Sequence, residues 1–196
     1  MKTSNIILIS IIGFIVLIGG CTCSKYNSLV KADENVNLKW GNVQSDYQRR
    51  ADLIPNLVST VKGVADFEKS TLTAVIEARA QATQMKVDAS NLTPEKLKQF
   101  QAAQGQLGSA LGRLMVISEN YPQLKANENF RDLQAQLEGT ENRIKVARND
   151  FNQAVQEFNS SIRTFPNNIL SGMFGFHVRI YFESEPSADK APEVKF

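Results

Sequence analysis

The sequence predicts an all-α protein: an antiparallel up-and-down four-helix bundle preceded by an N-terminal membrane anchor. Three observations support this prediction. Apolar residues recur at steps of three and four over four long stretches, strand signals are almost absent, and an uncharged apolar run opens the chain. Short connections between long helices favour antiparallel neighbours. We therefore expect an anchor at residues 1–24, a helical bundle at 25–182 and a disordered tail at 183–196.

The anchor has two alternative interpretations. Residues 3–24 carry no charge, and this uncharged run is long enough for a single-pass transmembrane helix. The dense apolar part at 6–18 is shorter and suits a signal peptide, and small residues precede Cys21, as at a lipoprotein processing site. More lysines follow the run than precede it, which favours a retained helix with the domain in the cytoplasm. Lipidation of Cys21 would place the domain outside. Both alternatives predict a membrane protein.

The first corner of the bundle is predicted within residues 49–55. A helix that begins near Tyr26 is expected to end at Arg49 to Ala51, with Asp52 as the N-cap of the next helix and Pro55 in its first turn. The rival interpretation is one continuous helix kinked at Pro55. We favour a turn because an unbroken helix to residue 86 would extend far beyond its partners.

The remaining helices have clear boundaries. Thr93 is a predicted N-cap, with Pro94 at the first helical position. The helix that follows contains three glycines at small spacings, which suggests close packing against a neighbour. Those glycines are Gly105, Gly108 and Gly112.

The last long helix is predicted to begin at an Asn127 or Asn129 cap and to end before Pro166. Within it two Phe-Asn pairs recur at a spacing of seven, so both return to one face in a coiled-coil-like pattern. Residues 169–182 are expected to form a turn of helix and an extended piece on the end of the bundle.

Composition argues against several function classes. The chain has 22 Lys and Arg against 20 Asp and Glu, scattered through the helical stretches, so we expect no nucleic-acid partner. Its one histidine and two cysteines, both cysteines in the N-terminal run, offer no Cys/His zinc site, and no Glu-x-x-His motif suggests a di-metal site. We expect no metal, no cofactor and no enzymatic activity.

Several polar residues lie on or beside the predicted inward faces. They are Glu68, Arg79, Glu141, Arg148, Asn152 and Asn159. Two interpretations are open: a pocket for a small molecule or peptide, or a structural layer in which the arginines pair with the glutamates. We favour the structural layer. Arg49 and Arg50 are candidate surface contacts for anionic lipid or an acidic partner, although charge at a helix C-terminus is the preferred role.

Longer stretches of the sequence resemble the LemA family. The matching stretches are residues 26–30, residues 48–58, Glu119-Asn120-Tyr121-Pro122, Asn129-Phe130, residues 137–144, the Phe-Asn pairs and Phe165-Pro166. The resemblance implies a membrane anchor carrying long antiparallel helices, and it implies no enzymatic activity. The presence of Cys21 and Cys23 departs from a plain spanning helix and leaves the topology open.

The predicted function is therefore a membrane-anchored scaffold or adaptor of the bacterial cell envelope that works through an unknown protein partner. The alternative is a binding module that holds a small molecule or peptide in the polar layer between helices.

Overall fold

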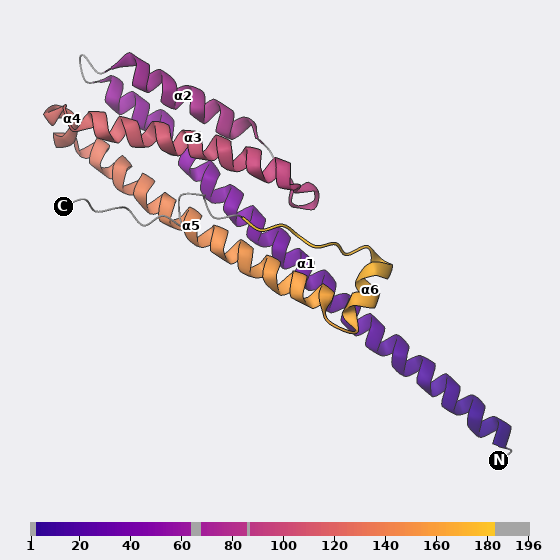
Figure 1. Cartoon of the computed structure of the whole chain (residues 1–196). Coiled ribbons are helices and arrows are strands. Elements are labelled where there is room, and N and C mark those ends of the chain that lie inside the picture. The colour runs from indigo at the N-terminus through magenta and orange to yellow at the C-terminus, as the bar shows by residue number, and fades with distance from the viewer. Residues whose placement is uncertain (1–2, 64–67, 86, 183–196) are drawn as a thin grey trace, which may run out of the picture.

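The computed structural model describes residues 3–63, 68–85 and 87–182. Its helices, in chain order, are α1 (Thr3–Lys62), α2 (Lys69–Gln84), the short 3-10 helix η1 (Ala89–Asn91), α3 (Pro94–Ser118), α4 (Pro122–Ala126), α5 (Glu128–Arg163) and α6 (Asn167–Phe174) (Figure 1). The all-α prediction is confirmed. The predicted tail at 183–196 lies outside the described residues.

The first corner lies later than the sequence predicts. Helix α1 runs unbroken for 60 residues, with Pro55 inside it. Asp52 is an interior residue whose carboxylate accepts a hydrogen bond from Gln48 at 2.7 Å, so the predicted N-cap at Asp52 is wrong. The corner falls after Lys62, and the rival interpretation of one continuous helix through Pro55 is the correct one. Helix α1 nevertheless ends at Lys62, well before residue 86, so the objection that a continuous helix would be too long does not apply to it.

An interior proline is tolerated because a side chain from α2 completes the hydrogen bonding. Proline has no N–H, so Pro55 cannot donate to the carbonyl of Ala51 one turn earlier. Arg79 supplies the missing donor, with its Nε 2.8 Å from the Ala51 oxygen. Ala51 is buried, and an unsatisfied carbonyl there would be costly. The contact joins residues 28 apart in sequence, and local helix rules do not anticipate it.

Two apolar cores lie one after the other along the α1–α5 pair. In the core near the corner all four long helices contribute, including Leu57, Val75, Leu107 and Leu137. The other core uses α1, α5 and the first turns of α3, around Trp40. Helices α2 and α3 therefore complete a four-helix arrangement over one part of the molecule only, as Figure 1 shows. α1 and α5 are antiparallel, since Leu29 of α1 shares one core with Ile162 of α5, while the later Leu57 shares the other core with the earlier Leu133.

The predicted start signals of the two later helices are confirmed. The Thr93 hydroxyl accepts from the Lys96 N–H at 3.2 Å, and Pro94 opens α3. Of the two candidate caps for α5, Asn127 is used, and its side-chain oxygen accepts from the Phe130 N–H at 3.2 Å.

After α6 the chain forms an extended segment, residues 175–182, which we call the strap. It covers the part of the α1–α5 pair that α2 and α3 leave open, and it runs from the α6 end toward the middle of the molecule (Figure 1). Phe176 contacts the ring of Phe158 near the end of α5, while Phe182 stacks on Trp40 with ring centres 5.7 Å apart. The prediction of a helical turn and an extended piece is confirmed, but the piece extends well beyond the bundle end.

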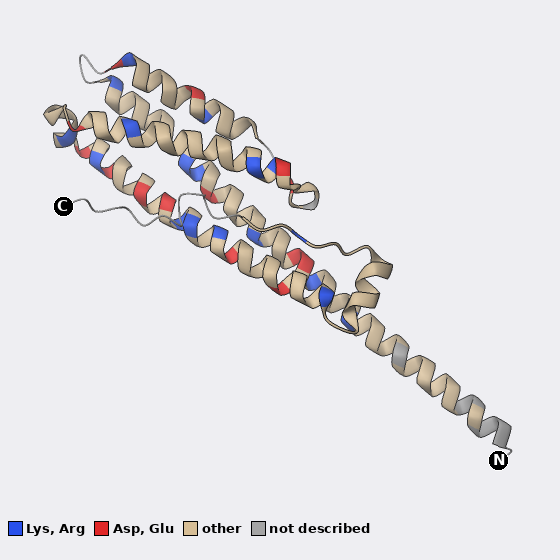
Figure 2. Ribbon diagram, viewed as in Figure 1, with Lys and Arg blue, Asp and Glu red and all other residues tan. Residues whose placement is uncertain are grey.

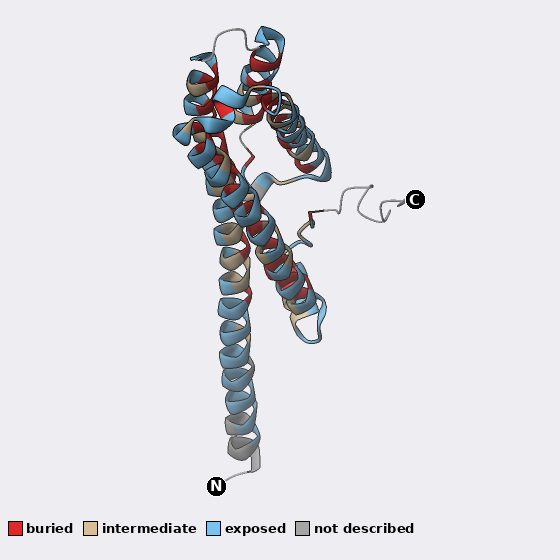
Figure 3. Ribbon diagram, turned by 90° about the vertical axis from the view of Figure 1, so that its left-hand side faces the viewer, coloured by how far each residue is buried: buried red, intermediate tan, exposed pale blue. Residues whose placement is uncertain are grey.

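The N-terminal part of α1 projects beyond the bundle. The apolar residues described there are exposed, for example Leu17 at 69% and Phe14 at 64% (Figure 3). This part carries no charged residue, whereas Lys, Arg, Asp and Glu are interspersed over the bundle helices (Figure 2). Among the described residues it is the one segment long and apolar enough to cross a membrane, a test that a signal sequence also passes. Cys21 and Cys23 are exposed in it.

Candidate functional site

A polar layer separates the two apolar cores. It consists of Arg50 of α1, Gln104 of α3 and Glu141 of α5, which lie at the same height along the bundle. On α1, Arg50 lies between Tyr47 of one core and Ile54 of the other. Arg50 Nη1 donates to Glu141 Oε2 at 2.7 Å, and Nη2 donates to Gln104 Oε1 at 2.8 Å. Nη2 also contacts the Gln104 carbonyl at 3.1 Å. The network therefore ties α1 to α3 and α5 at a single level.

Arg50 is the central residue of this layer, and it is only 4% exposed. The prediction that it lies on the surface or at a helix end is wrong, because α1 continues past it and its side chain points into the bundle. Arg49 is exposed, but it too lies in the helix interior, where offsetting the helix dipole has little effect. The Nε atom of Arg50 is buried without a hydrogen-bond partner. The carboxylate that balances Arg50 belongs to a side chain that is 63% exposed.

Tyr47 lies against Arg50, whose guanidinium carbon is 5.1 Å from the ring centre. Burial of the phenol raises the pKa of Tyr47, and the positive charges of Arg148 and Arg50 partly oppose that rise. Arg148 also hydrogen bonds the phenol, and it lies 4.9 Å from the ring centre of Phe182 in the strap. Arg148 thus lies in the same neighbourhood as Arg50 and Glu141.

An open groove of about 1330 Å³ lies over this layer, and we call it the α3–α5 groove. Its floor and walls come from α1, the start of α3, α5 and the strap. The lining residues include Tyr47, Arg50, Glu95, Lys98, Ala102, Gln104, Gly105, Gly108, Ser109, Glu141, Arg148 and residues 178–181. The groove exceeds the usual volume of a small-molecule pocket, about 300–1,000 Å³.

The small residues of α3 face this groove and open solvent. A Cβ atom built on Gly105, Gly108 or Gly112 meets nothing within 4 Å. The predicted close packing of these glycines against a neighbour is therefore wrong. α3 packs on α2 through its other face, where Leu107, Leu111 and Leu114 are buried. Gly105 and Gly108 instead form part of the groove wall.

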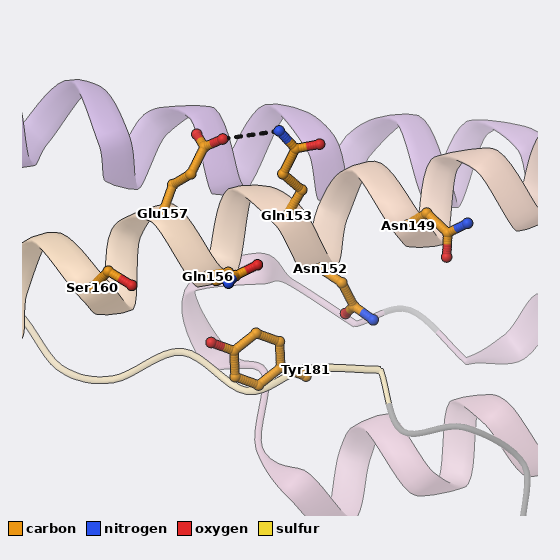
Figure 4. Close-up of a pocket in the computed structure, with 7 residues that line it drawn as sticks. All are labelled: Asn149, Asn152, Gln153, Gln156, Glu157, Ser160 and Tyr181. Carbon is orange, nitrogen blue, oxygen red and sulfur yellow. Dashed lines mark hydrogen bonds between the residues drawn. The ribbon is translucent and has the colours of Figure 1, made fainter.

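Asn152 and Asn159 hold the strap through its main chain. Asn159 Nδ2 donates to the Arg179 carbonyl at 2.8 Å, and its Oδ1 accepts from the Arg179 N–H at 2.8 Å. Asn152 makes the same pair of bonds with Phe182, at 3.1 and 2.8 Å. Seven helical residues span about 10.5 Å and three extended residues about 10 Å, so the two repeats match. Figure 4 shows Asn152 projecting from α5 beside an exposed row of polar side chains.

The structure divides the predicted polar layer among four places. Glu141 is in the layer itself, and Arg148 lies beside it. Arg79 serves the main chain of α1, and the two asparagines serve the strap. Glu68 is exposed at the start of α2, where it accepts from Ser70 at 2.7 Å and Thr71 at 3.3 Å, so its predicted inward position is wrong. Glu141 pairs with Arg50, a partner that the sequence analysis did not consider.

Sequence reasoning missed two members of the site, Arg50 as a buried residue and Gln104. Each is a polar residue at a position where the apolar pattern of its helix leads one to expect an apolar residue, and this interruption could have identified both from the sequence.

The described residues also contain no candidate metal site. Within the described parts of the chain, no three His, Cys, Asp or Glu side chains are grouped so that they could hold a metal ion.

Comparison with known proteins finds similarity to magnetosome proteins and to a LemA protein. Magnetosome protein MamQ 2 of Paramagnetospirillum magneticum is 28% identical over 203 residues, which cover 93% of this chain and 72% of that protein. Protein LemA of Metamycoplasma hominis is 25% identical over 160 residues, covering 81% and 69%. The family model described as the LemA family matches residues 39–196, which include the polar layer, the groove and the strap. The chain therefore belongs to the LemA family.

Proposed function

We propose that this protein is a membrane-anchored, non-enzymatic scaffold or adaptor of the bacterial cell envelope, and that it binds a protein partner in the α3–α5 groove. The groove is the observation that carries the proposal. It is open and larger than most small-molecule sites, and part of its α3 wall consists of the small residues Ala102, Gly105, Gly108 and Ser109. A partner's main chain could approach α3 closely there.

The anchor supports the same proposal. The exposed apolar segment and the bundle share one continuous helix, α1, so the groove would be held at a fixed height above the membrane. We propose a single-pass anchor, with a lipid on Cys21 as the alternative. Intact-mass analysis of the mature protein separates them: loss of residues 1–20 with added lipid mass supports the lipid anchor, and an unprocessed chain supports the spanning helix.

Site-specific photo-crosslinking in cells tests the partner. A photoreactive residue at Ser109, which lines the groove, should capture a defined protein. The matched control is Gln106, exposed on the same helix but outside the groove lining. Equal capture from both positions, or no specific product from Ser109, would contradict the proposal.

A second candidate function, a binding module for a small molecule, is favoured by the polar floor of the same groove. Arg50, Gln104 and Glu141 converge there and would orient a polar ligand. A thermal shift of the purified protein with an extract of small metabolites, absent when Glu141 is replaced by Gln, would favour this candidate over the adaptor. Arg79, another member of the predicted polar layer, is unsuitable for such a test because its bond to the Ala51 carbonyl gives it a structural role.

A further inference from the structure

The outward face of α6 is apolar and exposed. Ile169 and Met173 lie two residues before and two residues after Ser171, which places both about 160° from it around the helix. Ser171 is buried, and its hydroxyl donates to the Ile162 carbonyl near the end of α5 at 3.0 Å. Ile169 is 56% exposed and Met173 is 73% exposed. The helix therefore turns a polar side chain toward the protein and apolar side chains away from it.

This arrangement is the reverse of that expected for a helix on a water-exposed surface, where the apolar face packs inward. A hydrogen bond from the Asn167 side chain to the Ser161 carbonyl, at 3.1 Å, adds a second polar contact on the inner side. The exposed apolar region continues into the turn before α6, where Phe165 is 76% exposed. Residues 164–178 contain no Asp, Glu, Lys or Arg. An exposed, uncharged apolar region of this kind marks contact with a partner or a membrane.

The position of α6 decides between these two. α6 lies beside α1 at the end of the bundle from which the N-terminal part of α1 projects (Figure 1). The ring centre of Tyr26 in α1 is 4.8 Å from that of Phe174 and 5.9 Å from that of Phe176. Tyr26 lies only two residues, about 3 Å along the helix, beyond the uncharged residues 3–24. That run is about 33 Å long as a helix, which matches a bilayer hydrocarbon core of about 30 Å. Tyr26 and α6 are therefore at the level of the bilayer surface when α1 spans the membrane.

The alternative anchor leads to the same level. A lipid on Cys21 would hold α1 at the membrane five residues before Tyr26, or about 7.5 Å along the helix. Tyr26 is partly exposed, and tyrosine is enriched where a protein crosses the membrane–water interface. A second copy of the chain is the rival occupant of the α6 face. The bilayer is favoured because α1, the helix that carries either anchor, contacts α6 directly.

We propose that α6 and the turn at Phe165 form an interfacial membrane contact, with Ile169 and Met173 inserted among the lipids of the bilayer that holds the anchor. The proposal rests on the membrane anchor proposed above and adds a second point of attachment beside it. A single spanning helix leaves the tilt and rotation of its domain to other contacts, and an interfacial contact fixes both. The α3–α5 groove is then held in one orientation relative to the bilayer.

The test uses the full chain in liposomes of phosphatidylcholine and phosphatidylglycerol, with the photoreactive residue p-benzoylphenylalanine at one position at a time. Met173 is the test position. The matched control is Val116, an apolar residue that is 72% exposed in the last turn of α3, beside α4 and away from α6 (Figure 1). After irradiation, intact-mass analysis should show at least about fivefold more protein–lipid adduct from Met173 than from Val116. Ile169 is the second test position, in case the label at Met173 disturbs α6, and it should give the same result.

A label at Leu17 reports the anchor separately, and where processing at Cys21 removes Leu17 the added lipid mass takes its place. Evidence of anchoring without lipid adducts from Met173 and Ile169 would refute the membrane contact of α6 and leave the anchor intact. Absence of both would refute the anchor as well. Equal adducts from Met173 and Val116 would show that the labelling does not depend on α6, and would count against the proposal. Adducts from Met173 to a second copy of the chain, in place of lipid, would also overturn it and assign the α6 face to self-association.

Discussion

The contact between Arg79 and the Ala51 carbonyl explains how α1 passes through Pro55, and it can be tested by removing either side. In Arg79→Ala, the buried carbonyl loses the donor that replaces the missing proline N–H. A hydrogen bond to a charged group contributes about 1.5–3 kcal/mol, and leaving a buried acceptor unsatisfied costs a similar amount. We therefore expect the free energy of unfolding to fall by about 2–3 kcal/mol.

Pro55→Ala restores the N–H, so the helix can satisfy the Ala51 carbonyl by itself. In that background Arg79→Ala should cost less, and the coupling energy of the double-mutant cycle should be about 1–2 kcal/mol. Pro55 is exposed, so replacing it removes little packing. Alanine is also a better residue for a helix interior by about 3 kcal/mol, part of which the structure already recovers through Arg79.

Urea unfolding of the full chain in micelles measures all four proteins of the cycle. Far-UV circular dichroism follows the helices, and the fluorescence of Trp40, the single tryptophan, follows the other core. Coincident transitions license a two-state treatment. If Arg79→Ala costs the same with Pro55 as with Ala at this position, the two residues are not coupled. The explanation for the unbroken α1 would then be wrong.

Three further predictions concern the strap, the polar layer and the glycines of α3. Asn152→Asp replaces the donor to the Phe182 carbonyl with a carboxylate. The protection of the strap amides from hydrogen exchange should therefore fall by about 1–3 kcal/mol, and Trp40 emission should shift to the red. Asn149→Asp, exposed on the same helix, is the control, and equal effects of the two variants would contradict the role of Asn152 in holding the strap. Burial raises the pKa of Tyr47, so above about pH 10 the unfolded chain ionises first and stability is lost as pH rises toward the folded-state pKa. Urea titrations between about pH 9.5 and 11 should therefore show a shallower loss in Tyr47→Phe than in wild type, by up to about 1.4 kcal/mol per pH unit, and parallel curves would refute this. Gly112→Ala should stabilise the protein by about 0.5–1 kcal/mol in thermal unfolding, because a Cβ there meets nothing, whereas destabilisation would revive the close-packing interpretation.

The features that sequence predicted correctly depend on short-range rules. Thr93 and Asn127 cap helices because their side chains reach an N–H three residues away, and this needs no tertiary information. The apolar stripe of α5 is similarly local, since its spacing alone fixes which face is buried. The LemA resemblance rested on such segments, and the family match confirms it.

The features that sequence missed depend on distant partners. Pro55 at an interior position becomes acceptable only when Arg79 arrives from another helix, so the local rule placed the corner too early. Gly105 and Gly108 suggested close packing, but which face of α3 meets α2 is decided by the leucines on the opposite side. Arg50 is different, because its position was visible in the sequence.

Arg50 occupies an apolar step of α1, with Tyr47 three residues before it and Ile54 four residues after it. The same is true of Gln104 between Phe100 and Leu107. A polar residue that interrupts an apolar stripe at the same level of two helices predicts a buried layer, whatever its neighbours in sequence suggest. Arg49 and Arg50 together resemble a charged helix end, but only Arg50 lies on the apolar stripe of α1, and the two must be considered separately to predict its burial.

The position of Arg50 also connects recognition to anchoring. It lies on the same unbroken helix as the apolar N-terminal segment, about 26 residues or 39 Å beyond residue 24. A lipid on Cys21 would change the anchor but not this helix, which continues from Cys21 to Arg50 over about 44 Å. Both proposed anchors therefore hold the groove at nearly the same distance from the membrane. Insertion of a flexible glycine–serine segment after Ser24 should reduce crosslinking from Ser109 to a partner that is itself fixed in the membrane. Unchanged crosslinking would show that the rigid continuity of α1 has no part in recognition.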